Sequence, residues 1–273
     1  MTPLPCSLIW NPSLSPFSIF GVEIRYYSIC WIVGLALGLY IMQHLYKKQK
    51  ISDELFEPLF MYCFLGILIG ARLGHCLFYE PEYYLSHFWE MILPIKFTDA
   101  GVKFIGYQGL ASHGGTIGLF TALWLYCRKT KVKFAVVLDN IAITTPIVAA
   151  MIRLGNFMNS EILGRATDSP FGIIFAQVDN VPRHPAQLYE AIAYIVFFIG
   201  GWLLYKKFPQ KVGTLFYFGY CLATIFTFRF FVEFLKEVQV DFENGMLLDM
   251  GQILSIPFMI IGVACMIYSQ KKK

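Results

Sequence analysis

The feature that most constrains this chain is a series of apolar blocks, each about twenty residues long. They lie at approximately residues 26–46, 55–79, 109–127, 134–153, 186–205, 212–235 and 247–269. Blocks of this length match a hydrocarbon core roughly 30 Å thick. Because lipid offers no partner for backbone polar groups, each block is expected to be a helix. We therefore predict an all-α integral membrane protein with about seven transmembrane helices, in which residues 1–273 form a single polytopic membrane domain.

Composition supports a membrane protein and excludes an ordinary soluble domain. The chain is 57% hydrophobic and 15% charged, with a mean hydropathy of +0.57, whereas soluble domains are about a quarter charged. The seven cysteines are scattered singly. Neither a metal-ligand spacing nor a phosphate-binding loop occurs in the sequence. We expect no metal site, no cofactor and no nucleic-acid partner.

The basic residues of four short segments predict the orientation. Residues 47–50, 128–133, 206–211 and 271–273 carry 13 of the 22 lysines and arginines. These segments follow alternate apolar blocks, so they lie on one side of the membrane. Basic loops mark the cytoplasmic side. We expect the N-terminus outside and the C-terminus in the cytoplasm.

The remaining nine basic residues are mostly arginines, which is the reverse of the composition of these loops. They include six of the chain's seven arginines but only three of its fifteen lysines: Arg25, Arg72, Lys96, Lys103, Arg153, Arg165, Arg183, Arg229 and Lys236. Arginine matches phosphate or carboxylate with two parallel hydrogen bonds. Salt bridges between helices, or snorkelling to headgroups, explain a single arginine equally well. Six together favour an anionic ligand at membrane depth.

Helical spacing selects two of these arginines. Arg229 and Glu233 are four residues apart and would share one face of the sixth block. Arg153 and Asn156 are three residues apart and would share a face if the fourth helix continues past residue 153. Both arginines fall at the predicted extracytoplasmic ends of their blocks, where an anion could reach them.

Two further motifs carry chemistry. In "GLASHGGTIG" (109–118), His113 stands at the start of the third block, where it could accept a proton or simply satisfy a structural hydrogen bond. In "RHPAQLYE" (183–190), Pro185 suits a first helical turn, and Gln187 and Glu190 would share a face. Capping a helix start explains the proline, but a buried Glu190 still needs a partner.

These motifs together resemble the bacterial prolipoprotein diacylglyceryl transferases. The stretch "RLGNFMNSEILGR" (153–165) is similar to the signature of that family. "IRYY" (24–27), "GARLGHCLFY" (70–79), "SHGGTIG" (112–118), "RFFVEF" (229–234) and "MGQILSIP" (250–257) extend the resemblance over nearly the whole chain. The chain departs from the usual pattern at Leu110–Ala111, at Ile152 and at Ser160, where the family has glycine at the last two positions.

The resemblance implies a reaction and its partners. The diacylglyceryl group of phosphatidylglycerol would pass to the lipobox cysteine of a prolipoprotein signal peptide, giving a thioether and glycerol 1-phosphate. Membrane lipid would surround an enzyme of the bacterial inner membrane whose active site faces the extracytoplasmic side. This transferase is expected to work in lipoprotein biosynthesis, without metal or cofactor.

The resemblance also implies roles for individual residues. His113, Arg153 and Arg229 would be catalytic, with His113 either the proton acceptor or an organiser of the site. Glu233 would orient Arg229. The substrate-binding set would be Tyr27, Arg153, Asn156, Glu161, Gly164, Glu190 and Glu233, although Tyr26 is an alternative to Tyr27.

Two other classes of protein compete with a transferase. A membrane transporter of an anionic substrate would also place charges within helices, but it predicts internal repeats that the sequence lacks. A structural subunit would need no polar cluster at all. Lipidation of a lipobox peptide separates the transferase from both.

Overall fold

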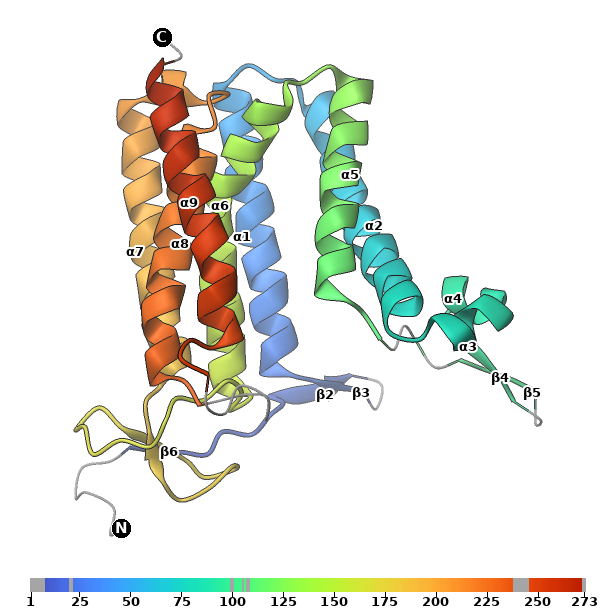
Figure 1. The fold of residues 1–273 in the computed structure, drawn as a ribbon, viewed down its shortest axis with the longest axis vertical. Coiled ribbons are helices and arrows are strands. Elements are labelled where there is room, and N and C mark those ends of the chain that lie inside the picture. The colour runs from blue at the N-terminus through green and yellow to red at the C-terminus, as the bar shows by residue number, and fades with distance from the viewer. Residues whose placement is uncertain are drawn as a thin grey trace. The chain divides into compact units, whose positions relative to one another are not determined.

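The computed structural model describes residues 8–19, 22–98, 101–104, 106, 109–237 and 246–271. Two compact units make up the chain (Figure 1). Unit 1 comprises Met1–His44 and Leu138–Lys273, and unit 2 comprises Leu45–Val137.

Helices form at all seven predicted blocks, which confirms the mostly helical fold. They are α1 (Tyr26–Lys48), α2 (Asp53–Phe78), α5 (Ser112–Thr130), α6 (Phe134–Met158), α7 (Ala186–Lys207), α8 (Phe216–Val232) and α9 (Met250–Lys271). Six of them are long and apolar enough to cross a membrane, which makes this a multi-pass membrane protein. The exception among the seven is α5, because it opens on Ser-His-Gly-Gly-Thr and carries Arg128 and Lys129 in its last turn.

Unit 1 is a helical bundle with small sheets beyond one end of its helices. α8 packs against both α7 and α9 (Figure 1). The strand β1 (Leu8–Trp10) runs parallel to β6 (Ile173–Phe175), which pairs with β7 (Pro182–Arg183). A hairpin of β2 (Phe17–Ile19) and β3 (Val22–Ile24) precedes α1. The all-α prediction missed these short strands.

A buried apolar cluster anchors these strands to the end of α6. It contains Phe157, Leu163, Ile173 and Phe175, with Trp10 packed against it. The Trp10 indole donates a hydrogen bond to the Phe157 carbonyl at 3.2 Å. This cluster therefore fixes the loop that follows α6, which carries the signature motif.

Unit 2 is built on the close approach of α2 and α5. Gly66, Gly70 and Gly74 face Gly114 and Gly118, so that the two backbones touch. In membranes, small residues permit this approach because helix association depends on packing and not on the hydrophobic effect. The chain between the two helices forms α3 (Pro81–Ser86), α4 (Phe88–Ile92) and a hairpin of β4 (Ile95–Thr98) and β5 (Gly101–Phe104).

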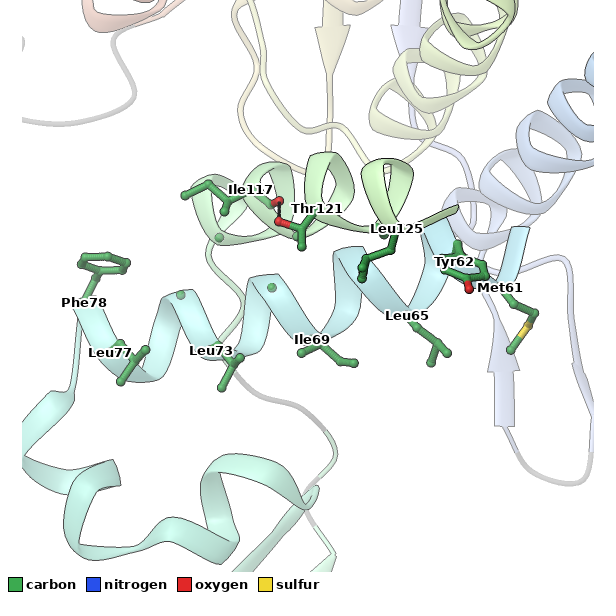
Figure 2. A pocket seen from close by; sticks show the side chains of 16 residues that line it. Met61, Tyr62, Leu65, Ile69, Leu73, Leu77, Phe78, Ile117, Thr121 and Leu125 are labelled. Atoms are coloured by element: carbon green, nitrogen blue, oxygen red, sulfur yellow. Dashed lines mark hydrogen bonds between the residues drawn. The ribbon is translucent and has the colours of Figure 1, made fainter. Parts of the chain in front are cut away.

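Beside this glycine contact lies an apolar groove of about 600 Å³. Figure 2 shows Leu65, Ile69, Leu73 and Leu77 spaced along α2, with Ile117 on α5. None of the side chains that line the groove is charged. Such a lining suits contact with lipid tails.

The glycine contact predicts opposite effects for two Gly→Ala changes. A Cβ at Gly70 would overlap the backbone of Gly114 and Gly118, whereas a Cβ at Gly115 meets the Ala71 Cβ at an ordinary 3.4 Å. We expect Gly70→Ala to destabilise the protein by about 1–3 kcal/mol, as overpacking does. Gly115→Ala serves as the matched control and should be neutral or stabilising, because alanine favours a helix by about 1 kcal/mol.

Thermal unfolding of the purified proteins in one detergent measures both effects. Equal midpoints for Gly70→Ala and Gly115→Ala would show that the α2–α5 contact tolerates a Cβ where the structure leaves no space.

Candidate active site

The signature loop is organised by side chains at the end of α6. The helix continues to Met158, so Arg153 and Asn156 share a face as predicted, and the Arg153 Nη1 donates to the Asn156 Oδ1 at 3.4 Å. The Asn156 and Asn159 amides in turn donate to the Glu161 carboxylate at 3.2 and 3.0 Å. Glu161 therefore fixes the amide that receives Arg153.

In the turn after α6, the serine at position 160 adopts a backbone conformation that is typical of glycine. Ser160 has a φ of 54°, a left-handed conformation that glycine adopts freely and that costs other residues roughly 1–2 kcal/mol. This is one of the positions where the chain departs from the signature that it resembles. The departure is therefore one of backbone strain, and the polar contacts of Asn156 and Glu161 are kept.

Gly164 brings the signature loop against two other segments. Its N–H donates to the His184 carbonyl at 3.0 Å, and it forms a β-bridge with Lys236. A Cβ at Gly164 would overlap the carbonyl oxygens of His184 and Leu235. Gly164 thus joins the loop to the start of α7 and the end of α8.

Tyr27 lies against the signature motif. A Cβ added to Gly155 would lie 2.9 Å from the Tyr27 ring, and Gly155 directly precedes Asn156. This contact favours Tyr27 as the residue that matches the family's tyrosine, and its role in binding substrate stays a prediction.

Glu190 is buried at the start of α7 and has the partner that the sequence analysis required. Its side chain is 0% exposed, and its Oε2 lies 3.1 Å from the Arg153 Nε. Its Oε1 lies 3.3 Å from the Lys236 Nζ and accepts a hydrogen bond from the Tyr194 hydroxyl at 3.2 Å. One carboxylate therefore holds two cations that come from different parts of the chain.

The Gln187 side chain adds a contact between α7 and the signature loop. Its amide donates to the Glu161 carbonyl. Gln187 and Glu190 therefore share a face of α7, as predicted. Gln187 contacts the loop after α6, and Glu190 contacts Arg153 in the last turns of α6.

The predicted pair of Arg229 and Glu233 does not form, which corrects the sequence analysis. The Glu233 Oε2 lies 3.0 Å from the Lys236 Nζ instead. α8 ends at Val232, and residues 233–235 form a 3₁₀ turn. In a 3₁₀ turn, residues three apart lie over one another, so Lys236 comes within reach of the Glu233 carboxylate, although the Glu233 N–H still donates to the Arg229 carbonyl in α-helical register.

Arg229 consequently has no counter-charge among the residues that the structure describes. No carboxylate in the described part of the chain forms an ion pair with it, although it is partly buried in the last turn of α8. The Tyr194 hydroxyl is close enough to interact electrostatically with both Arg153 and Arg229. Both arginines thus lie near one tyrosine, and among the described residues the Arg229 guanidinium has no carboxylate partner.

Three of the other arginines serve the protein's own structure. Arg72 donates to the carbonyls of Glu90 at 2.6 Å and Met91 at 3.2 Å. The Arg165 Nε donates to the Lys236 carbonyl at 2.9 Å. The idea that six arginines together serve an anionic ligand is therefore too broad.

Arg183 is the third arginine with a structural role. It lies 2.6 Å from Asp179 and 2.9 Å from Glu237. Its hydrogen bond lowers the pKa of the Asp179 carboxyl. Of the arginines in unit 1 beyond residue 138, only Arg153 and Arg229 belong to the cluster around Tyr194.

His113 belongs to unit 2, whereas the arginine cluster belongs to unit 1. It is exposed at the second position of α5. The neighbouring Gly114 approaches the backbone of α2 at Gly70 and Gly74. The glycines beside His113 thus serve helix packing, and the meeting of His113 with Arg153 stays a prediction.

Lys236 is the member of the cluster that the sequence analysis missed as a site residue. It is 3% exposed and lies between Glu190 and Glu233. The available signal was its place among the few lysines outside the basic loops. Spacing alone could not reveal Glu190 as its partner, since the two residues are 46 positions apart.

Comparison with known proteins identifies the family of this chain. The family model of prolipoprotein diacylglyceryl transferase matches residues 15–268. A phosphatidylglycerol–prolipoprotein diacylglyceryl transferase of Bacteroides fragilis is 58% identical over 274 residues, which cover 100% of this chain and 99% of that protein. Proteins of the same name from Tolumonas auensis and Vibrio cholerae are 40% and 34% identical, over 97% and 98% of this chain and 99% and 96% of theirs. This chain belongs to the prolipoprotein diacylglyceryl transferase family.

Proposed function

We propose that this chain transfers the diacylglyceryl group of phosphatidylglycerol to the thiol of a lipobox cysteine in a prolipoprotein signal peptide. The observation that carries the proposal is the pair of arginines around Tyr194, one of them unpaired among the described residues. A partly buried cation without a counter-charge is costly, so a membrane protein that retains one is suited to bind an anion. The phosphate of phosphatidylglycerol is such an anion.

The reaction is a substitution at the glycerol carbon that carries the phosphate. The cysteine sulfur forms a bond to this carbon, and the bond from the carbon to the phosphate oxygen breaks. The electron pair of the broken bond stays on that oxygen, so glycerol 1-phosphate leaves as an anion. The thiol proton passes to a base, because the thiolate is the nucleophile.

Some residues of the site bind the phosphate, and others orient the residues that bind it. Arg153 and Arg229 stabilise the charge that grows on the departing phosphate. Asn156 and Glu161 orient Arg153 through the hydrogen bonds described above. His113 is the candidate proton acceptor, since histidine exchanges protons near neutral pH.

Four other residues shape the substrate site in this proposal. Tyr27 lines it beside Gly155, and Gly164 closes the signature loop. Glu190 and Glu233 hold the cations, with Glu233 acting on Lys236 instead of on Arg229.

Family membership decides between this proposal and the anion transporter of the sequence analysis. The relatives are named as transferases over their full lengths. The transporter alternative is therefore set aside.

Purified protein, phosphatidylglycerol and a lipobox peptide test the reaction directly. We expect the peptide to gain the mass of one diacylglyceryl group and glycerol 1-phosphate to appear in equal amount. A matched peptide with serine in place of the lipobox cysteine is the control and should remain unmodified. Lipidation of the serine peptide, or none of the cysteine peptide, would contradict the proposal.

The active site is proposed to face the extracytoplasmic side of the bacterial inner membrane, with the C-terminus in the cytoplasm. The basic segments support this orientation. We expect an impermeant thiol reagent to label Asp168→Cys in intact cells and to leave Lys129→Cys unlabelled, in a background without native cysteines. Both positions are exposed, so both should react once the cells are permeabilised. The reverse pattern would invert the topology and the location of the site.

A further inference from the structure

Lys236 stands out because lysine is almost never fully buried without being paired. Its side chain is 2% exposed, and its Nζ contacts two carboxylates, Glu190 at 3.3 Å and Glu233 at 3.0 Å. Neither contact follows from binding a phosphate, which is the role of the neighbouring arginines. The role of this buried ammonium group therefore needs a separate explanation.

The contacts form a chain of alternating charge. Arg153 contacts Glu190, Glu190 contacts Lys236, and Lys236 contacts Glu233. The chain carries two positive and two negative charges, so it is neutral as it stands. Glu190 is the shared link, because each of its oxygens faces a different cation.

The Glu233 end of the chain is held by α9. A Cβ on Gly251 would lie 2.7 Å from the Glu233 carboxyl carbon and 2.8 Å from its Oε1. Gly251 thus leaves the space that the carboxylate occupies. With Glu233 confined there, the Lys236 ammonium is held beside Glu190.

The proposed function requires Arg153 to contact the phosphate, although Arg153 is already paired with Glu190. To bind phosphate with both of its hydrogen-bonding edges, Arg153 has to give up the Glu190 contact. A buried carboxylate that loses its only cation is strongly destabilised, and that cost would oppose substrate binding. Lys236 removes this cost, because Glu190 keeps a cation after Arg153 turns away.

We propose that Lys236 is a positioning residue that keeps Glu190 paired, so that Arg153 can exchange Glu190 for the phosphate of the substrate. The inference rests on the proposed function and assigns the buried ammonium a role in substrate affinity. Lys236 need not touch the lipid in this role.

A purely structural role is the competing explanation, because the backbone of Lys236 also joins two segments. Its carbonyl accepts from the Arg165 Nε, and it forms the bridge with Gly164. Those contacts use backbone atoms and persist when the side chain is changed. Side-chain variants therefore separate the two roles.

The test compares Lys236→Met, Lys236→Arg and the double variant Lys236→Met/Glu190→Gln. In Lys236→Met, Glu190 is held by Arg153 alone and competes with the phosphate. We expect its KM for phosphatidylglycerol to rise about tenfold while kcat changes less than about threefold, the size of effect typical of one close charge pair. Lys236→Arg keeps the charge and should stay within about threefold of wild type in both constants.

The double variant decides between positioning and structure. It removes both the lysine and the competing carboxylate, so we expect its KM to return most of the way to the wild-type value. The exposed Lys103 on β5 provides a control, Lys103→Met, that should leave KM unchanged. The double variant also leaves Glu190 without a charge to bury, so it remains informative if Lys236→Met fails to fold.

Direct binding separates this inference from the proposed reaction. The dissociation constant for short-chain phosphatidylglycerol in detergent should rise for Lys236→Met in step with KM. An inactive wild-type enzyme would contradict the proposed function, whether or not binding changes. An active wild type with an unchanged KM and unchanged binding in Lys236→Met, or a double variant no better than the single one, would overturn the role of Lys236 alone.

Discussion

Arg153→Lys is expected to lower the rate of diacylglyceryl transfer by a factor on the order of 100 or more, as removal of one transition-state donor does. Lysine keeps the positive charge, but its ammonium group cannot present two parallel N–H donors to a phosphate. It also cannot contact Glu190 through one nitrogen and Asn156 through another, as Arg153 does at 3.1 and 3.4 Å. Initial rates at saturating phosphatidylglycerol and lipobox peptide measure the loss.

An arginine-to-lysine exchange away from the site is the control for Arg153→Lys. Arg128 lies in the last turn of α5 with its guanidinium over the Trp124 ring, and Arg128→Lys should keep nearly full activity. Circular dichroism and thermal unfolding should show both variants folded. Near-normal turnover by a folded Arg153→Lys protein would mean that the geometry of the guanidinium is not required.

Hydropathy predicted most of the fold, because each transmembrane helix corresponds to one continuous apolar block. α7 begins at Ala186 as expected, and α1 begins at Tyr26. α6 runs five residues past the predicted end at Arg153. The predicted block ended at Arg153, although Arg153 is satisfied inside the protein by Glu190 and Asn156 and so does not end the helix.

Contacts within the site could be predicted only between residues that are close in sequence. The contact between Arg153 and Asn156 follows from helical spacing and was confirmed. The contacts of Glu190 with Arg153 and Lys236 join positions far apart in the chain, and nothing local encodes them. A buried carboxylate indicated that a partner exists, but its identity depends on how α7 packs against the ends of α6 and α8.

The error at Glu233 has a local cause. Spacing of four residues predicts that Arg229 and Glu233 share a helix face, but it does not decide which cation the Glu233 carboxylate contacts. Glu233 keeps its α-helical hydrogen bond to the Arg229 carbonyl, but the 3₁₀ turn that begins at residue 233 places Lys236 beside its carboxylate. The sequence "RFFVEFLK" contains neither glycine nor proline, so it lacks two of the strongest signals for ending a helix.

Arg229 has no ion-pair partner in the described part of the chain, and this leads to the second large prediction. Arg229→Met removes a cation that binds no carboxylate among the described residues, and it leaves no buried acid behind. We expect transfer to fall by a factor on the order of 100, the size of a lost electrostatic contact in a transition state. The thermal unfolding midpoint should stay the same or rise, because an uncompensated, partly buried charge opposes folding.

Arg183→Met should lower stability and leave transfer activity nearly unchanged, which is the opposite of the result expected for Arg229→Met. Arg183 pairs with Asp179 and with Glu237, whose side chains are 28% and 55% exposed, so its loss should cost stability by about 1 kcal/mol or less, as for partly exposed pairs. Its activity should remain within about threefold, since its charge is already committed to the protein. A lower unfolding midpoint for Arg229→Met with unchanged transfer would show that Arg229 is a structural residue, and the phosphate would then have to be held by Arg153 without it.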